Sequence, residues 1–317
     1  MILLNLLLFI AAISVLVIGG AMIIKSLSKI AAFLHISEYA VGFIILAFAT
    51  SLPELFVGIS SAINKTPAIV LGDVIGANIA DLTYVIGIPI LLARGIKIHS
   101  KKTKKDSLWM IALAALPLML MAIGNQISRT DGIILICAFL LYVRKLIKES
   151  RQFSKEIGNN ISRKAMVASV FLFMIGLVLL YKSSDYVVKY ASLLAIDFSV
   201  PPILIGLFMV AIGTSLPELV SGISAVLKGH DEMSVGNIIG TVIANSTAIL
   251  GVSALIFPIT ANIFVFTASA SFMILATILF TAFVEKGNRL SWFDGVSLVL
   301  MYIFFLIVEF YLRGFIK

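Results

Sequence analysis

Two glutamates, Glu54 and Glu218, lie in the middle of long apolar stretches of the sequence. An acidic side chain at the centre of a membrane helix costs about 2.5–3.5 kcal/mol on insertion scales. Neither stretch has a central Lys or Arg that could pair with the carboxylate. Carboxylates without basic partners bind protons or metal cations. Because intramembrane acids usually mark functional sites, we interpret the pair as part of a cation site.

The residues beside each glutamate add further oxygen ligands. Pro53 and Pro217 remove a helical N–H and crowd the carbonyl four residues earlier, so we expect a break in each helix. Hydroxyl groups lie within one turn of the glutamates, at Thr50, Ser51, Thr214 and Ser215. Carboxylates, hydroxyls and free carbonyls suit hard cations such as Ca²⁺ and Na⁺. The alternative is that these hydroxyls bond back to their own helix.

Other polar residues are predicted at membrane depth. Asp81 is expected to add a third carboxyl group to the site, and Asn245 occupies the corresponding position in the second half of the chain. The alternative for Asp81 is a protonated acid that is hydrogen-bonded between helices. Asp73 lies nearer the end of its apolar stretch and is interpreted as a mouth or helix-cap residue. Glu309 is interpreted as an interfacial group.

The composition identifies the elements that must position these residues. Of 317 residues, 61% are hydrophobic and 13% are charged, whereas globular proteins have roughly 25% charged residues. The mean hydropathy of +1.12 excludes a water-soluble enzyme. At about 20 residues per crossing, the chain forms a polytopic helical membrane protein. We predict ten spans, at residues 2–23, 38–63, 68–93, 107–124, 131–147, 165–184, 201–227, 233–257, 261–284 and 292–312.

The basic residues predict the orientation in the membrane. Most of the 24 Lys and Arg residues fall in or beside connections on one side of the ten-span plan, with clusters at 101–105 and 145–164. The positive-inside rule places these connections in the cytoplasm and both termini outside the cell membrane. The net charge of +8 is therefore attributed to topology and to contact with the lipid bilayer, not to nucleic acid.

An internal repeat defines the organisation of the chain. Residues 42–91 match 206–255 without a gap, at a constant offset of 164 residues. Thr-Ser-Leu-Pro-Glu occurs at the same place in both copies. Each half holds five predicted spans, so the second half enters from the opposite side of the membrane. Inverted repeats of this kind are used by secondary transporters.

We therefore predict an all-α polytopic fold with two inverted five-helix repeats. The repeats cover residues 1–147 and 165–317, and a basic cytoplasmic linker joins them at 148–164. Helices 2, 3, 7 and 8 are expected to be broken around a mid-membrane ion site. No Gly-x-x-x-x-Gly-Lys-Ser/Thr loop for ATP is found, and the single Cys137 excludes a disulfide framework or a cysteine metal cluster. These features favour a transporter over an enzyme.

The two Thr-Ser-Leu-Pro-Glu copies, each followed by a helix with paired glycines (Gly72/Gly76 and Gly236/Gly240), resemble the α-repeats of the sodium/calcium exchanger family. The resemblance implies antiport, with Ca²⁺ and Na⁺ competing for one cluster of sites and no tightly bound cofactor. It implies that Glu54 and Glu218 bind both ions. The other implied ligands are the carbonyls of Thr50 and Thr214 for Ca²⁺, the carbonyls of Ala47 and Ala211 with Ser51 and Ser215 for Na⁺, and Asp81 and Asn245 at the centre.

The sequence departs from the family pattern at two places. Asp81 and Asn245 occur in the reverse order, which leaves the charge unchanged. Ala77 replaces a family serine, whereas Thr241 keeps a hydroxyl in the second copy. One Na⁺ ligand is therefore absent, and Ca²⁺/H⁺ antiport at the same site stays open as an alternative. A passive cation channel or a membrane-embedded sensor is a third hypothesis. We expect the protein to function as a monomer.

Overall fold

A computed structural model of the protein describes residues 2–33, 47–98, 100–150, 162–260 and 263–312. The first half of the chain contains α1 (Ile2–Phe33), α3 (Ala47–Thr50), α4 (Leu52–Ile63), α5 (Pro67–Ala80), the π-helical turn η2 (Asp81–Val85), α6 (Ile86–Leu92), β1 (Ile96–Lys97), α7 (Lys101–Gly124), β2 (Gln126–Ile127) and α8 (Arg129–Ser150). The parts of the predicted repeat at 42–46 and of the linker at 151–161 lie outside the described residues.

The second half follows the same order of elements, with α10 and η3 in addition to those described for the first half. It contains α9 (Arg163–Asp197), α10 (Pro202–Ile205), the π-helical turn η3 (Gly206–Val210), α11 (Ala211–Thr214), α12 (Leu216–Leu227), α13 (Asp231–Ala244), the π-helical turn η4 (Asn245–Ile249), α14 (Leu250–Ile256), β3 (Ile259–Thr260), α15 (Ile263–Lys286), β4 (Arg289–Leu290) and α16 (Trp292–Leu312). From α4 to α6, every element begins and ends 164 residues before its counterpart between α12 and α14.

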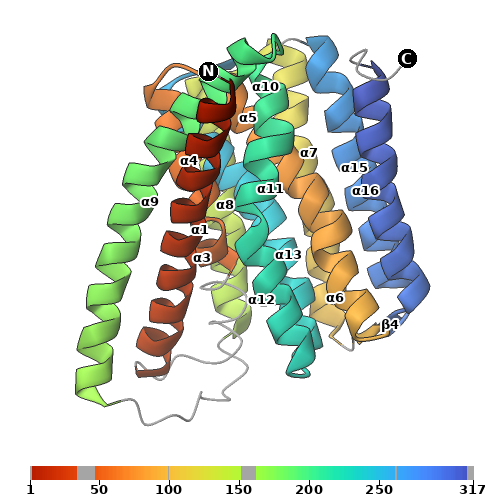
Figure 1. The fold of residues 1–317 in the computed structure, drawn as a ribbon. Coiled ribbons are helices and arrows are strands. Elements are labelled where there is room, and N and C mark those ends of the chain that lie inside the picture. Colours follow the sequence, from red (N-terminus) through yellow and green to blue (C-terminus); the bar gives the residue numbers. More distant parts are fainter. Residues whose placement is uncertain (1, 34–46, 99, 151–161, 261–262, 313–317) are drawn as a thin grey trace.

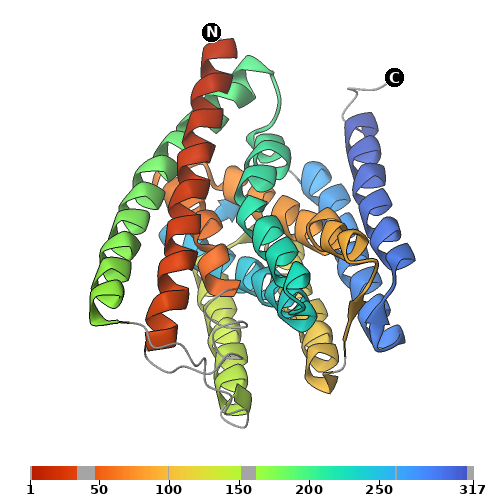
Figure 2. The same ribbon diagram turned by 60° about the horizontal axis from the view of Figure 1, so that its bottom comes forward.

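The four short strands join the two halves. Strand β1 pairs antiparallel with β4, and β2 pairs antiparallel with β3. Each two-stranded ladder therefore takes one strand from each half of the chain. Helix α1 begins and α16 ends at the same end of the molecule (Figures 1 and 2).

Helices α1 and α9 form a long antiparallel pair along one edge of the molecule (Figures 1 and 2). The Asn5 amide near the start of α1 donates a hydrogen bond of 2.6 Å to Asp197 at the end of α9. The two helices cross closely at Gly19 and Gly176, where an added Cβ on Gly19 would lie 3.2 Å from the Gly176 carbonyl oxygen. Small residues at a crossing allow such close approach.

The predicted ends of these two helices are wrong. The first span was expected to end at residue 23 and the sixth at residue 184, but α1 continues to Phe33 and α9 continues to Asp197. Lys25 and Lys182 lie on exposed faces, so their charges do not interrupt the helices.

Eight helices in the described ranges are long and apolar enough to cross a membrane. The predicted span 38–63 is described only from residue 47, where the short apolar helix α4 follows the break. The predicted span 131–147 lies within α8, a 22-residue helix that is not among the eight. The described chain is thus an all-helical polytopic membrane protein, apart from its four two-residue strands.

The duplicated helices are more deeply buried than the other membrane-spanning helices. In the segment Pro67–Leu92, 83% of the most apolar window is buried, and in Asp231–Ile256 the share is 89%. In α9 the corresponding share is only 17%. The duplicated helices therefore form the centre of the molecule, and α9 exposes most of its apolar surface.

Glycines allow the close contact between α5 and the segment α10–η3. A Cβ on Gly72 would lie 2.1 Å from the Ile203 carbonyl oxygen, and one on Gly76 would lie 2.2 Å from that of Leu207. Because real Cβ atoms do not approach backbone this closely, the Gly72-x-x-x-Gly76 pattern is a packing surface, as its small-residue spacing predicts.

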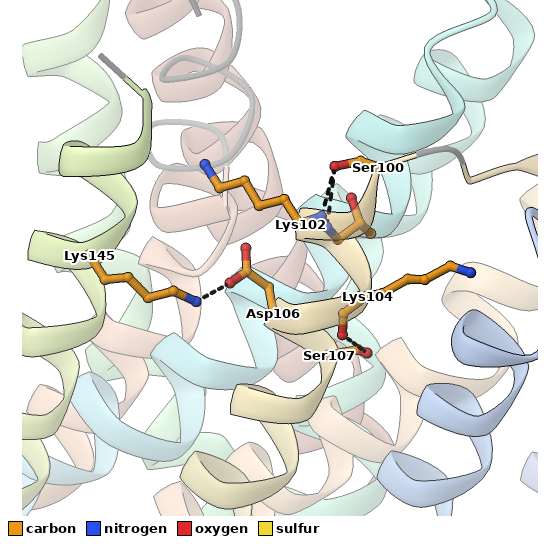
Figure 3. Close-up of polar contacts among 7 residues, drawn as sticks. Ser100, Lys102, Lys104, Asp106, Ser107 and Lys145 are labelled. Carbon is orange, nitrogen blue, oxygen red and sulfur yellow. Dashed lines mark hydrogen bonds and ion pairs between the residues drawn. The ribbon is translucent and has the colours of Figure 1, made fainter. Parts of the chain in front are cut away.

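Polar contacts also join α7 to α8 and α15 to α16. Figure 3 shows the Lys145 ammonium group of α8 beside the buried Asp106 of α7, at 2.6 Å. In the second half, Ser269 donates a hydrogen bond to Glu309. The interpretation of Glu309 as an interfacial group is wrong, because its side chain is fully buried. A hydroxyl donor inside the protein makes that position tolerable for the acid.

Candidate functional site

The two Thr-Ser-Leu-Pro-Glu segments adopt the same broken-helix conformation. Ser51 lies between α3 and α4 with φ −80° and ψ 2°, and Ser215 lies between α11 and α12 with φ −77° and ψ 0°. Helical residues have ψ near −42°. The hydrogen bonds of α4 begin with the Leu55 N–H, which donates to the Ser51 carbonyl at 3.0 Å. The predicted breaks in helices 2 and 7 are therefore present.

The prolines occupy positions where helices tolerate them. Pro53 and Pro217 each lie at the start of the helix that follows the break. The first N–H groups of a helix have no partner within it, so the missing proline N–H is no loss there. The proline in each segment thus ends one short helix and starts the next.

Glu54 and Glu218 lie in the first turns of α4 and α12. Both side chains are fully buried, and all four carboxylate oxygens lack a hydrogen-bond partner among the described residues. The positive end of each helix dipole favours negative charge at this position. A dipole alone does not replace the lost hydration of a buried carboxylate, so the geometry suits a bound cation or a proton.

Hydroxyl groups connect the two halves across the site. The hydroxyls of Thr50 and Thr241 lie 3.5 Å apart, and Thr214 donates to the Asp73 carboxylate at 3.1 Å. Thr214 also lies 3.3 Å from the carbonyl oxygen of Ala211, within its own helix. Thr214 therefore contacts its own helix, as the alternative interpretation expects, and also Asp73 in the other half, while its role as a cation ligand stays a prediction.

Asp81 and Asn245 are the first residues of the π-helical turns η2 and η4. Both side chains are fully buried, and their polar atoms have no hydrogen-bond partner among the described residues. Ser215, whose hydroxyl also lacks a partner there, lies beside Asp81. Thr50 lies beside Glu218. π-helical turns within α-helices often occur at functional sites, and here they turn these two side chains into the protein centre.

The prediction that helices 3 and 8 are broken is wrong, because each continues through a π-helical turn. In the first half, α5, η2 and α6 follow one another without an interruption, and the same holds for α13, η4 and α14. The polar residues at these points are accommodated by a wider helical turn. The Thr83 hydroxyl donates to the Ile79 carbonyl, and Thr247 donates to that of Ile243, so both turns satisfy backbone acceptors in the same way.

The carbonyl groups are only partly available. Ala211 begins α11, and its carbonyl accepts the Ser215 N–H at 3.0 Å. A carbonyl oxygen has a second lone pair that can still bind an ion. Ala47 begins α3. No three His, Cys, Asp or Glu side chains within the described ranges form a compact metal cluster. Cation binding would therefore depend on hydroxyl, amide and carbonyl oxygens as well as on carboxylates.

Asp73 was placed wrongly by the sequence. It was expected at a mouth or helix cap, but its side chain is fully buried in the middle of α5 and is bonded to Thr214. The sequence did contain one indication of this burial. Asp73 lies four residues before Ala77 and eight before Asp81, and residues four apart lie on the same face of a helix. The missing piece was the position of α11, which only the tertiary structure provides.

With this geometry established, comparison with known proteins identifies the family. A model of the family described as "Sodium/calcium exchanger protein" matches residues 4–148 and 168–311, which is most of the chain. The chain belongs to this family. Its members are transporters, so the prediction of a transporter and not an enzyme is confirmed.

Similar proteins cover between 76% and 98% of this exchanger-family chain. The sodium/calcium exchanger MaX1 of Methanosarcina acetivorans is 27% identical and aligns with 98% of this chain and all of its own. The inner membrane protein YrbG of Escherichia coli is 30% identical over 76% of each chain. A structure of the sodium-calcium exchanger NCX_Mj, soaked with Na⁺ and Sr²⁺, has a TM-score of 0.69 at 25% identity and covers 97% of this chain and 99% of its own.

Proposed function

We propose that the protein is a secondary active antiporter that exchanges Ca²⁺ for Na⁺ across the cell membrane. The observation that carries the proposal is a pair of buried glutamates that have no hydrogen bond to the described part of the chain, each placed directly after an equivalent helix break. Family membership supports ion exchange as the activity. MaX1 and NCX_Mj carry the name sodium/calcium exchanger, which favours Na⁺ and Ca²⁺ as the substrates.

The proposed ligands come from both halves of the chain. Glu54 and Glu218 would bind both ions, with the carbonyls of Thr50 and Thr214 completing the Ca²⁺ position. The remaining proposed ligands are Ser51, Ser215, Asp81, Asn245, Thr241 and the carbonyls of Ala47 and Ala211. Burial of the described side chains in this set supports a site that is closed to solvent on both sides.

We further propose alternating access between two inverted five-helix repeats, 1–147 and 165–317. The antiparallel packing of α1 on α9, which are equivalent elements of the two halves, supports the inverted arrangement. Because this pair lies at the edge and exposes most of its apolar windows, we propose that it moves against the core. Both termini would be extracellular, and one chain would suffice for transport.

Ca²⁺/H⁺ exchange at the same site is the second candidate. Ala77 supports it, because the position has no hydroxyl for Na⁺. Carboxylates at this depth can carry protons instead of a metal ion.

The test is Ca²⁺ uptake into proteoliposomes that contain the purified protein. Uptake driven by an outward Na⁺ gradient, at equal pH on both sides, is the expected result. Uptake driven only by an outward H⁺ gradient would replace the first proposal with the second. Flux that needs neither gradient would contradict both proposals and favour a channel. The Glu54→Gln variant should show no uptake under either gradient.

A further inference from the structure

Asp73 is a buried acid that has no basic partner among the described residues. Its side chain is fully buried in α5, and one carboxylate oxygen accepts the Thr214 hydroxyl while the other has no hydrogen-bond partner among the described residues. Within the same ranges, no Lys, Arg or His forms an ion pair with it. A buried carboxylate with a free oxygen is unfavourable unless a cation or a further donor compensates it.

The two halves of the site differ at this place. The position equivalent to Asp73 is Asn237, a neutral side chain whose amide lies 3.4 Å from the Ser221 hydroxyl. One turn further along, the first half has Ala77, whereas the second half has Thr241, whose hydroxyl faces Thr50. The first half therefore lacks a hydroxyl but has an additional carboxylate, one helical turn away on the same face of α5.

We propose that Asp73 is a ligand for Na⁺, at a subsite that it forms with the Thr214 hydroxyl and the Ala211 carbonyl. This assignment rests on the proposed function and deepens it, because it replaces the ligand that Ala77 cannot provide. The Thr214 hydroxyl can donate to Asp73 and still offer a lone pair to an ion. The three groups include a single carboxylate, whose charge balances a monovalent ion, and they supply fewer oxygens than the roughly 6–8 that Ca²⁺ binds.

A Na⁺ ion at Asp73 also changes the net charge of the buried region that contains the central carboxylates. Asp73 interacts electrostatically with Glu54, Asp81 and Glu218 across the protein centre. Four carboxylates in one buried region repel each other, and each added cation relieves that repulsion. A Na⁺ at Asp73 therefore neutralises one of these charges and weakens the attraction of the central glutamates for a further cation, which is consistent with competition between Na⁺ and Ca²⁺ although Asp73 is not part of the Ca²⁺ position.

The test measures ion binding by thermal unfolding of the purified full-length protein in detergent. Midpoint temperatures are recorded against NaCl, with choline chloride holding the ionic strength constant, and separately against CaCl₂. For Asp73→Asn we expect the half-saturating Na⁺ concentration to rise at least about tenfold, with that for Ca²⁺ changed less than about threefold. Adding Ala77→Ser to Asp73→Asn should restore part of the Na⁺ response.

Asn237→Ala is the matched control, since it removes a polar side chain at the equivalent buried position without changing charge. It should leave both ion responses near those of the natural protein. Equal Na⁺ responses in Asp73→Asn and the natural protein would overturn the proposal, as would equal losses for Na⁺ and Ca²⁺. If Asp73→Asn does not fold, Asp73→Ser is measured in its place. Absence of both ion responses in the natural protein would instead contradict the proposed function.

Discussion

At the scale of single residues, the buried acids of this protein differ in their hydrogen bonding. Glu54 and Glu218 are buried, and the described residues give their carboxylates no geometric hydrogen bond, whereas Glu309 is equally buried but accepts a hydrogen bond from Ser269. Burial alone therefore does not distinguish a transport site from a structural acid. The lack of a hydrogen bond within the described part of the chain is the property that supports Glu54 and Glu218 as the proposed ion ligands.

Replacing Glu54 with Gln should weaken Ca²⁺ binding by at least about tenfold, because one charge-assisted contact is worth about 1.5–3 kcal/mol. The shift of the unfolding midpoint with CaCl₂ measures this effect. Glu309→Gln is the control, since it removes a buried acid outside the proposed site. It should lower thermal stability but retain the midpoint shift, and loss of that shift in both variants would contradict the assignment of Glu54.

At the scale of helices, the two halves of the chain position these residues with the same local backbone structure. The breaks at Ser51 and Ser215 have nearly identical dihedral angles, and η2 and η4 begin at equivalent residues. The breaks could be predicted from sequence, because proline has a defined effect on a helix. The π-helical turns could not, because no residue type requires a wide turn and the surrounding packing selects it.

Close packing of α5 should depend on its glycines. Gly72→Ala would place a Cβ 2.1 Å from a backbone oxygen, so the helices must separate. Overpacking of this kind destabilises proteins by about 1–3 kcal/mol, and we expect a lower unfolding midpoint in detergent. Gly124→Ala is the matched control, because a Cβ there meets no atom within 4 Å. Equal midpoints for the two variants would contradict the packing role of Gly72.

At the scale of the whole molecule, the sequence predicts the fold class but not the lengths of all the helices. Composition and the repeat predicted a polytopic helical protein with a central acidic site, and both features could be derived from periodicity and charge alone. The lengths of α1 and α9 could not, because Lys25 and Asp185 lie just beyond the predicted ends and resemble span ends, whereas Lys25 is exposed and Asp185 accepts a hydrogen bond from Ser60. The burial of Asp73 likewise depends on contacts between distant segments.

The inverted arrangement predicts opposite sides for related loops. Lys65 follows α4 and Lys228 follows α12, and both are exposed. In a Cys137→Ser background, a cysteine at position 65 should react with an impermeant maleimide from outside intact cells. A cysteine at position 228 should react only after the membrane is opened. Labelling of both from the same side would disprove the inverted repeat.

The length of α9 connects this protein to the thickness of its bilayer. Its 35 residues span about 52 Å, compared with about 30 Å for the hydrocarbon core. Such a helix must tilt, protrude or deform the lipid, and each response has an energy that changes with acyl-chain length. If the α1–α9 pair moves during exchange, hydrophobic mismatch acts directly on that motion. Turnover in liposomes would then vary with lipid chain length while ion affinity in detergent stays constant, which makes the membrane itself a regulator of the transport rate.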